Sequence, residues 1–82
     1  MKKQWFVYIL ECCDGSFYTG VTTDVDKRMK AHAEGKGSKC VYGKGFGKLL
    51  FAKPCESKSD AHKCEYEIKK LPRGEKLEYF ND

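Results

Sequence analysis

The sequence predicts a single small α+β domain, in which helices flank a three-stranded antiparallel sheet in the order β-β-α-β-α-α. Two runs rich in aromatic and β-branched residues, at 5–11 and 17–21, flank a turn signal and indicate a hairpin. Later segments repeat apolar residues at helical spacing. The chain has 82 residues, so residues 1–82 have room for only one domain.

The first two strands are expected to pair through a short loop. Residues 5–11, WFVYILE, are nearly all apolar, as in a strand that is covered on both faces. We predict a three-residue loop at 13–15 in which Gly15 takes the left-handed conformation and forms a bulge. A two-residue Asp-Gly turn is the alternative, and the choice between them decides which way the side chains of the second strand point.

Two tyrosines of this hairpin, Tyr8 and Tyr18, lie on one face if the loop is odd. The odd loop pairs Leu10 with Tyr18 and Tyr8 with Gly20, because side chains alternate with a period of two. Gly20 is then expected to leave room for a ligand beside the two phenols. The two-residue turn would instead place the tyrosines on opposite faces.

The segment after the hairpin predicts a helix that begins at a threonine cap, Thr22 or Thr23, and ends near Glu34. Asp24 and Asp26 fall in its first turn, where the helix dipole favours negative charge. The residues expected to face inward are Val25, Met29 and Ala33. Arg28 and His32 are expected to flank this inward stripe.

Residues 35–48 contain five glycines and four lysines without a helical or strand period, which predicts a mobile, basic loop. The segment lacks the Lys-Ser/Thr pair and the following helix of a phosphate-binding P-loop. A third strand is expected at 49–53, closed by Pro54. The second helix should run from a cap at Ser57 or Ser59 to about Leu71, with a last short helix at 75–80. The inward stripe of the second helix is predicted to be Ala61, Cys64, Ile68 and Leu71.

Composition sets few limits on function. The net charge of +4 is mild and permits a polyanionic partner without requiring one. No apolar run reaches membrane-spanning length and no signal peptide is visible, so we expect a cytoplasmic protein without membrane association. Five cysteines, an odd number without C-x-x-C spacing, are expected to be reduced thiols. A zinc site would need Cys40, Cys55, His62 and Cys64, whose spacing fits no common pattern.

No single residue identifies the chemistry. A tyrosine is often a core aromatic, and a histidine or arginine beside an apolar stripe often only packs there. Glu65 borders the inward stripe of its helix, where a carboxylate needs a cation, a hydrogen-bond donor or a metal ion. From position alone, a salt bridge is the simpler explanation for Glu65.

Taken together, these residues resemble the GIY-YIG nuclease superfamily. Val7-Tyr8-Ile9 and Tyr18-Thr19-Gly20 are similar to its paired motif, and Arg28, His32 and Glu65 follow in the superfamily's order. The resemblance covers nearly the whole chain and is strongest to small standalone bacterial members. The N-terminal domain of the excision-repair incision subunit is also similar. This chain departs from the pattern at Val7, which replaces a glycine, and at Val21, where repair members carry a lysine. Asn81 has only an insecure match to the superfamily's C-terminal asparagine.

The resemblance implies an endonuclease that hydrolyses DNA phosphodiester bonds with one divalent ion, Mg²⁺ or Mn²⁺. In that chemistry Glu65 would hold the metal ion and Arg28 would clamp the non-bridging phosphate oxygens. Tyr18 would be the general base, with Tyr8 as the orienting phenol. Because forming a phenolate at neutral pH costs about 4 kcal/mol for a free phenol, His32 is a second candidate for the base.

The resemblance also implies a DNA partner, read by shape or flexibility rather than by sequence, such as branched, flapped or damaged DNA in repair or recombination. We expect a monomer without an organic cofactor. The lysines of the basic loop would approach the backbone, and Tyr42 and Phe46 are possible stacking partners. These lysines are Lys36, Lys39, Lys44 and Lys48. The alternatives are a nucleic-acid-binding module with weak or no catalysis and a scaffold for a protein partner.

Overall fold

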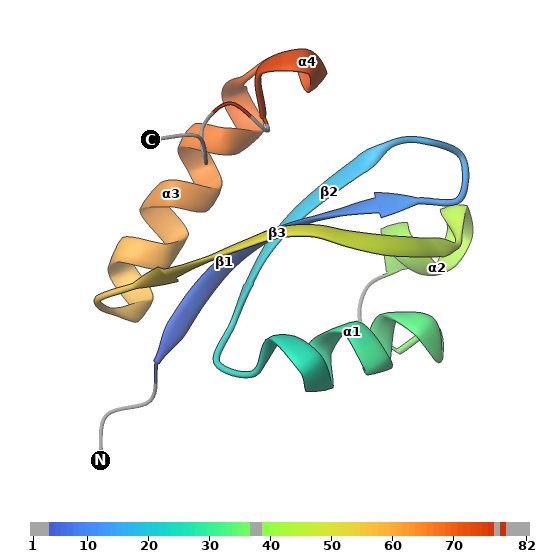
Figure 1. Cartoon of the computed structure of the whole chain (residues 1–82), viewed down its shortest axis with the longest axis horizontal. Coiled ribbons are helices and arrows are strands. Elements are labelled where there is room, and N and C mark those ends of the chain that lie inside the picture. Colours follow the sequence, from blue (N-terminus) through green and yellow to red (C-terminus); the bar gives the residue numbers. More distant parts are fainter. Residues whose placement is uncertain (1–3, 37–38, 77, 79–82) are drawn as a thin grey trace.

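The computed structural model describes residues 4–36, 39–76 and 78, and the side chains of residues 39, 40 and 73 lie outside this description. The elements in chain order are β1 (Trp5–Cys12), β2 (Phe17–Thr22), α1 (Val25–Ala33), α2 (Lys39–Lys44), β3 (Phe46–Cys55), α3 (Lys58–Lys70) and α4 (Arg73–Lys76) (Figure 1). The predicted α+β class with a three-stranded antiparallel sheet is confirmed. A short helix, α2, joins the expected order between α1 and β3.

β1 is the central strand, because the sheet order is β2-β1-β3 and both neighbours run antiparallel to it. Its residues from Val7 to Leu10 are buried, as the continuous apolar run predicts. Side chains that alternate along β1 enter two separate core clusters. Figure 1 shows α3 and α1 on opposite sides of the strands.

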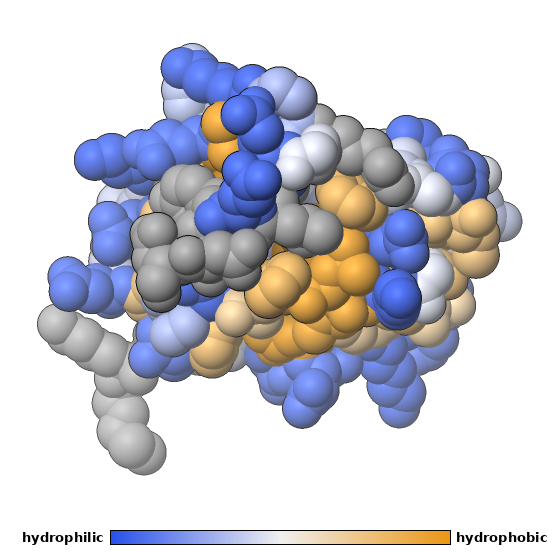
Figure 2. Space-filling view, turned by 45° about the horizontal axis from the view of Figure 1, so that its top comes forward, coloured by the Kyte–Doolittle hydropathy of each residue, from blue (hydrophilic) through white to orange (hydrophobic). Residues whose placement is uncertain are grey.

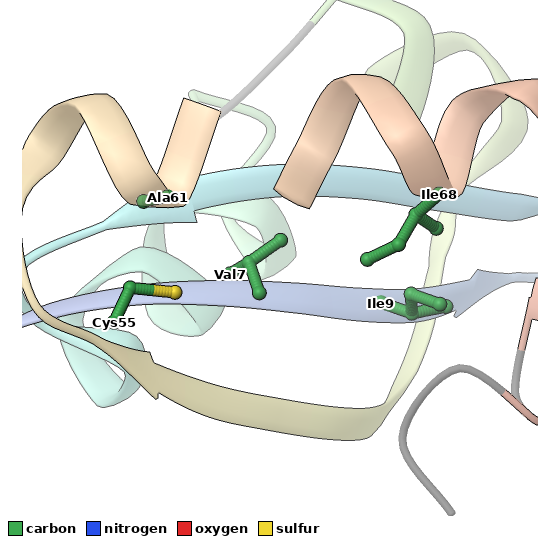
Figure 3. Packing of buried hydrophobic residues seen from close by; sticks show 5 residues of the cluster. All are labelled: Val7, Ile9, Cys55, Ala61 and Ile68. Atoms are coloured by element: carbon green, nitrogen blue, oxygen red, sulfur yellow. The ribbon is translucent and has the colours of Figure 1, made fainter. Parts of the chain in front are cut away.

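The first cluster lies between the sheet and α3. Val7 and Ile9 of β1 point toward Ala61 and Ile68 of α3, and the sulfur of Cys55 enters the same layer (Figure 3). Four of these residues have no exposed surface. Burying a valine or isoleucine side chain contributes about 1.5–3 kcal/mol, so this layer holds α3 firmly on the sheet.

The hairpin has the predicted odd loop. Gly15 has a φ of +87°, and the Cys12 amide donates to the Ser16 carbonyl at 2.8 Å, which leaves three residues in the loop. The Asp14 carboxylate accepts from both the amide and the hydroxyl of Ser16. The register then pairs Leu10 with Tyr18, as expected.

The predicted start and inward face of α1 were wrong in detail. Asp24, rather than a threonine, is the N-cap, and its carboxylate accepts from the Lys27 amide at 3.0 Å. The Thr22 hydroxyl instead accepts from the Asp24 amide. The helix is also rotated from the expected stripe, because Ala33 is exposed while His32 is only 2% exposed.

The predicted mobile loop at 35–48 was also wrong. It contains α2 and the start of β3, which begins at Phe46 and continues through Pro54. Val41 of α2 is fully buried in the second core cluster, and this contact explains why the segment is ordered. β3 is an edge strand, where a proline is tolerated.

Gly47 in this segment allows the close approach of two strands, β1 and β3. A Cβ on Gly47 would lie 2.6 Å from the carbonyl oxygen of Glu11 on the neighbouring strand. The strand pairing of β1 with β3 shifts register twice near this end. The glycine at position 47 is therefore explained by the close pairing of β3 with β1.

α3 agrees with the sequence prediction. Ser57 caps it by accepting from the Asp60 amide at 3.1 Å, and Ala61 and Ile68 of the predicted stripe are buried. α4 begins at Arg73, two residues before the predicted short helix at 75–80. Residues 77, 79 and 80 of that predicted helix, and Asn81, lie outside the described residues.

The surface is mixed in character. Figure 2 shows apolar residues gathered near the centre of one face, with hydrophilic residues around them. Leu49 and Phe51 of β3 are among the large apolar side chains that are partly exposed. Within the described part of the chain, no helix has the length and apolar character needed to cross a lipid bilayer.

Candidate functional site

The two tyrosines of the hairpin lie side by side on the face of the sheet that α1 covers. Their ring centroids are 6.4 Å apart, and the predicted pairing of Tyr8 with Gly20 is confirmed. A Cβ at Gly20 would lie 2.6 Å from the Tyr8 hydroxyl oxygen and 3.1 Å from Tyr18 Cε1. The expected space for a ligand at Gly20 is therefore filled by the Tyr8 phenol.

His32 of α1 completes this aromatic group. The Tyr8 hydroxyl and His32 Nε2 form a buried hydrogen bond of 2.9 Å, and both tyrosine rings meet the imidazole edge-on. Phe46, at the start of β3, stacks on the other side of the imidazole at an interplanar angle of 11°. His32 Nδ1 is buried without a hydrogen-bond partner in the described structure.

Burial shifts the protonation of this pair in opposite senses. It is the main cause that raises the pKa of Tyr8 above its ordinary value, and the neighbouring Tyr18 adds to that increase. Burial also lowers the pKa of His32, and the positive charge of Arg28 lowers it further. Tyr8 therefore keeps its proton at neutral pH, and His32 is the neutral imidazole.

The two remaining candidate residues act electrostatically on the same hydroxyl. Arg28 lies one helical turn before His32, and its charge lowers the pKa of Tyr8, whereas the charge of Glu65 raises it. Glu65 comes from α3, which packs against the opposite face of the sheet from the phenols, and its side chain is 20% exposed. β1, β2 and α1 therefore bring the two phenols and His32 into contact, whereas Arg28 and Glu65 are linked to Tyr8 in the described structure only through their charges.

Glu65 has both carboxylate oxygens in ion pairs along its own helix. His62 Nδ1 lies 3.4 Å from one oxygen and Lys69 Nζ lies 3.5 Å from the other. The salt bridge that position alone suggested is therefore present. These partners are half-exposed, so each pair contributes little to stability, and a stronger ligand can displace them.

A divalent metal ion bound by Glu65 would have this carboxylate as its single ligand from the described part of the protein. Among the described residues, no three His, Cys, Asp or Glu side chains are grouped closely enough to hold an ion. One hard oxygen donor is compatible with Mg²⁺, which keeps several water molecules and takes phosphate oxygens as further ligands. Cys55 and Cys64 lie close together, but among the described side chains no group of three ligands of the kind that zinc prefers is present. Cys40 lies outside the described side chains.

Three of the lysines that the sequence assigned to nucleic acid have an acidic neighbour. Lys36 Nζ is 4.0 Å from Glu34, Lys48 stands opposite Glu11 in the strand register, and the charge of Lys44 helps to lower the pKa of Asp14. The charges of these three lysines are thus partly compensated. The side chain of Lys39 lies outside the description.

The two aromatic residues of the same segment have different surroundings. Tyr42 is 72% exposed, and its ring covers Gly35, so it remains available for stacking. Phe46 stacks on His32, a contact that could not be predicted from the expectation that 35–48 forms one mobile loop. An aromatic residue at the first position of a strand was the available signal.

The fold and the aromatic group together define the class of protein. The family model of the GIY-YIG catalytic domain matches residues 4–78. The chain belongs to the GIY-YIG family, as the paired tyrosine motif predicted.

Within that family, the chain is similar to small bacterial proteins. It is 54% identical to the UPF0213 protein BH0048 of Halalkalibacterium halodurans over 87% of this chain and 76% of that protein. It is 42% identical to the UPF0213 protein YhbQ of Escherichia coli K12 over 88% of this chain and 72% of that protein.

Solved structures agree with this relationship. The solution structure of BH0048, from Bacillus halodurans, matches with a TM-score of 0.57 and 49% identity over 95% of this chain and 83% of that chain. The solution structure of protein EF2693 from E. faecalis matches with a TM-score of 0.67 and 36% identity over 98% of this chain and 85% of that chain.

Proposed function

We propose that this protein is a metal-dependent endonuclease that hydrolyses phosphodiester bonds in DNA. The substrate is selected by shape or flexibility, as in branched, flapped or damaged DNA, and the role is in repair or recombination. The observation that supports this most is the contact group formed by Tyr8, Tyr18 and His32, with Arg28 one helical turn before His32 on α1. Family membership supports the same reaction class.

We assign the general base to Tyr18 and a positioning role to His32. His32 is 2% exposed, and its Nε2 is hydrogen-bonded to Tyr8, so it has no open path to an attacking water molecule. The pKa of Tyr8 is raised by burial, which makes Tyr8 a poor base. Tyr18 is half-buried and is the remaining phenol of the pair.

The hydrogen bond between Tyr8 and His32 leaves one buried donor without a partner in either proton arrangement. If Tyr8 donates to Nε2, the hydrogen of the neutral imidazole sits on the buried Nδ1. If Nε2 donates to the Tyr8 oxygen, the O–H of Tyr8 is left over. Tyr8 is only 2% exposed, so we assign it the role of the orienting phenol, which holds the imidazole and packs beside Tyr18.

Hydrolysis would proceed with the following division of roles. Tyr18 acts as the phenolate, after its own proton has passed to solvent. A water oxygen attacks phosphorus, the water proton passes to the phenolate oxygen of Tyr18, and the bond to the leaving oxygen breaks. Arg28 donates to the non-bridging oxygens, where negative charge accumulates. Glu65 would hold Mg²⁺ or Mn²⁺, which stabilises charge on the phosphate and on the leaving oxygen when bound. The leaving oxygen takes a proton from solvent.

A cleavage panel tests the proposal. Wild-type protein with Mg²⁺ or Mn²⁺ is expected to nick branched, flapped or single-stranded DNA, and a parallel RNA series tests the choice of DNA. Glu65→Gln should abolish nicking while the amide NMR spectrum stays that of the folded protein. Glu67→Gln, an exposed position on the same helix, is the matched control and should retain activity. Equal nicking by wild type and Glu65→Gln would identify a contaminant and refute the proposal.

A nucleic-acid-binding module without turnover is the second candidate. Val21 stands where repair members carry a lysine, and both oxygens of Glu65 already have a partner on the same helix, His62 for one and Lys69 for the other. This reading predicts salt-sensitive binding to the same panel of substrates. Binding without nicking at any metal concentration would favour it.

A further inference from the structure

A pocket of about 260 Å³ adjoins the candidate site. It has room for several water molecules, each of which occupies about 30 Å³ in the liquid, or for a phosphate group. Arg28 connects the pocket with the candidate site. It lines the pocket, and its charge lowers the pKa of both Tyr8 and His32. The lining residues are Thr22, Thr23, Asp24, Lys27, Arg28 and Ala31.

The pocket has an excess of positive charge. Lys27 and Arg28 face one carboxylate, Asp24, which accepts from the Lys27 backbone amide as the cap of α1. Neither cation has an ion pair with an acidic side chain in the part of the chain that the structure describes. The lysines at 36, 44 and 48 differ in having acidic neighbours.

The helix sets Lys27 and Arg28 at different angles. Consecutive residues of an α-helix project about 100° apart. Arg28 is half-buried and Lys27 is exposed, although both line the pocket. Two neighbouring phosphates of one strand need this arrangement, with one cation at the reacting phosphate and a second cation beside it.

The two threonines of the pocket wall differ in whether their hydroxyl can bind a ligand. The Thr22 hydroxyl is occupied, because it accepts from the Asp24 amide and donates to the Asp24 carbonyl. Thr23 is half-buried on the pocket wall and is the hydroxyl available to a ligand. The N-terminus of α1 itself is already capped by Asp24, so the side chains, and not the helix end, form the site.

We propose that this pocket binds the phosphate next to the cleaved one, with Lys27 as the main contact and Thr23 as a secondary donor. The inference rests on the proposed function, because it places the neighbouring phosphate relative to the one that Arg28 holds. Lys27 sets the register of the strand and takes no part in the chemical step.

Binding in EDTA tests this inference separately from cleavage. The probe is a fluorescein-labelled DNA duplex with a single-stranded flap, titrated by fluorescence anisotropy at several salt concentrations. Lys27→Ala is expected to weaken binding about five- to eightfold at 0.1 M salt and to reduce the slope of log K against log salt by roughly 0.7–0.9, the value of one phosphate contact. Thr23→Val should give a smaller loss with the slope unchanged.

Lys30→Ala is the matched control, because Lys30 is an exposed lysine on the same helix that does not line the pocket. It should change affinity less than twofold. Equal losses for Lys27→Ala and Lys30→Ala, or no loss for either, would overturn the inference, as would a wild-type protein that does not bind the probe.

Cleavage separates this inference from the proposed function. If wild type fails to nick any substrate but Lys27→Ala still binds more weakly than Lys30→Ala, the phosphate site stands and the nuclease proposal fails. If wild type nicks DNA and the two lysine variants bind alike, the phosphate site fails and the nuclease proposal stands.

Discussion

Replacing Gly20 by alanine tests how the two phenols are held. The added Cβ would lie 2.6 Å from the Tyr8 hydroxyl oxygen, 2.8 Å from Tyr8 Cζ and 3.1 Å from Tyr18 Cε1. All three distances are shorter than van der Waals contact, and the two to Tyr8 are so short that its ring must move. Its hydroxyl is fixed by the 2.9 Å hydrogen bond to His32, and the movement strains or breaks that bond.

The expected cost has two parts. Overpacking of a well-packed core costs about 1–3 kcal/mol, and a buried polar group that loses its partner costs a further 1–3 kcal/mol or so. Tilting the Tyr8 ring can relieve the overpacking, but it weakens the hydrogen bond to His32, so the two costs do not simply add. We therefore expect a loss of about 2–4 kcal/mol in the free energy of unfolding. For a domain that is marginally stable, this is a large fraction of the total.

Urea denaturation followed by circular dichroism measures the change. Gly43→Ala is the control, since Gly43 lies in α2 and a Cβ there meets nothing within 4 Å. That variant should be neutral or more stable by up to about 1 kcal/mol, from helix propensity alone. Combining Gly20→Ala with Tyr8→Phe removes the closest contact, so the penalty of the alanine should be smaller in that background.

The reasoning fails if Gly20→Ala unfolds at the same urea concentration as wild type and leaves the imidazole NMR signals of His32 unchanged. That result would mean that the Tyr8 ring does not occupy the space over Gly20.

Three further predictions concern groups around this site. Phe46→Ala should lower stability by about 2 kcal/mol, less than for a fully buried phenylalanine, and an unchanged urea midpoint would deny the stacking on His32. The lowered pKa of His32 means that the folded state binds a proton less readily than the unfolded state. The free energy of unfolding should therefore fall as the pH drops below about 6.5, and His32→Gln should show a smaller fall between about pH 7.5 and about pH 5; equal falls would contradict this. In thiol labelling at mildly alkaline pH, the exposed Cys13 should react before Cys12, Cys55 and Cys64. Cys55, whose thiol pKa is raised chiefly by burial, should react only on unfolding; fast labelling of Cys55 in the native protein would be inconsistent with the core packing.

Local periodicity explains what could be predicted. The odd hairpin loop, the facing of Tyr8 and Tyr18, and the capped helix α3 all depend on residues close in the sequence. The spacing of Arg28 and His32 on one helix is of the same kind. Each needed only the periods of strand and helix and the conformational freedom of Gly15.

Contacts between distant segments explain what was missed. The segment at 35–48 has no period of its own, and it is ordered because Val41 enters the core beside Leu10. The sequence could not show whether Lys27 or the lysines at 36, 44 and 48 have the less compensated charge. Acidic neighbours such as Glu11 reach Lys48 only through strand pairing.

The sequence by itself therefore determined the α+β sheet, the hairpin register and the family's order of chemical groups, since these follow from local geometry. Only the tertiary structure decided that His32 is buried as a neutral imidazole between Tyr8 and Phe46, and that the Tyr8 phenol closes the space over Gly20. The physical reason is that burial, and with it the pKa of a side chain, is set by whichever residues pack against it from elsewhere in the chain.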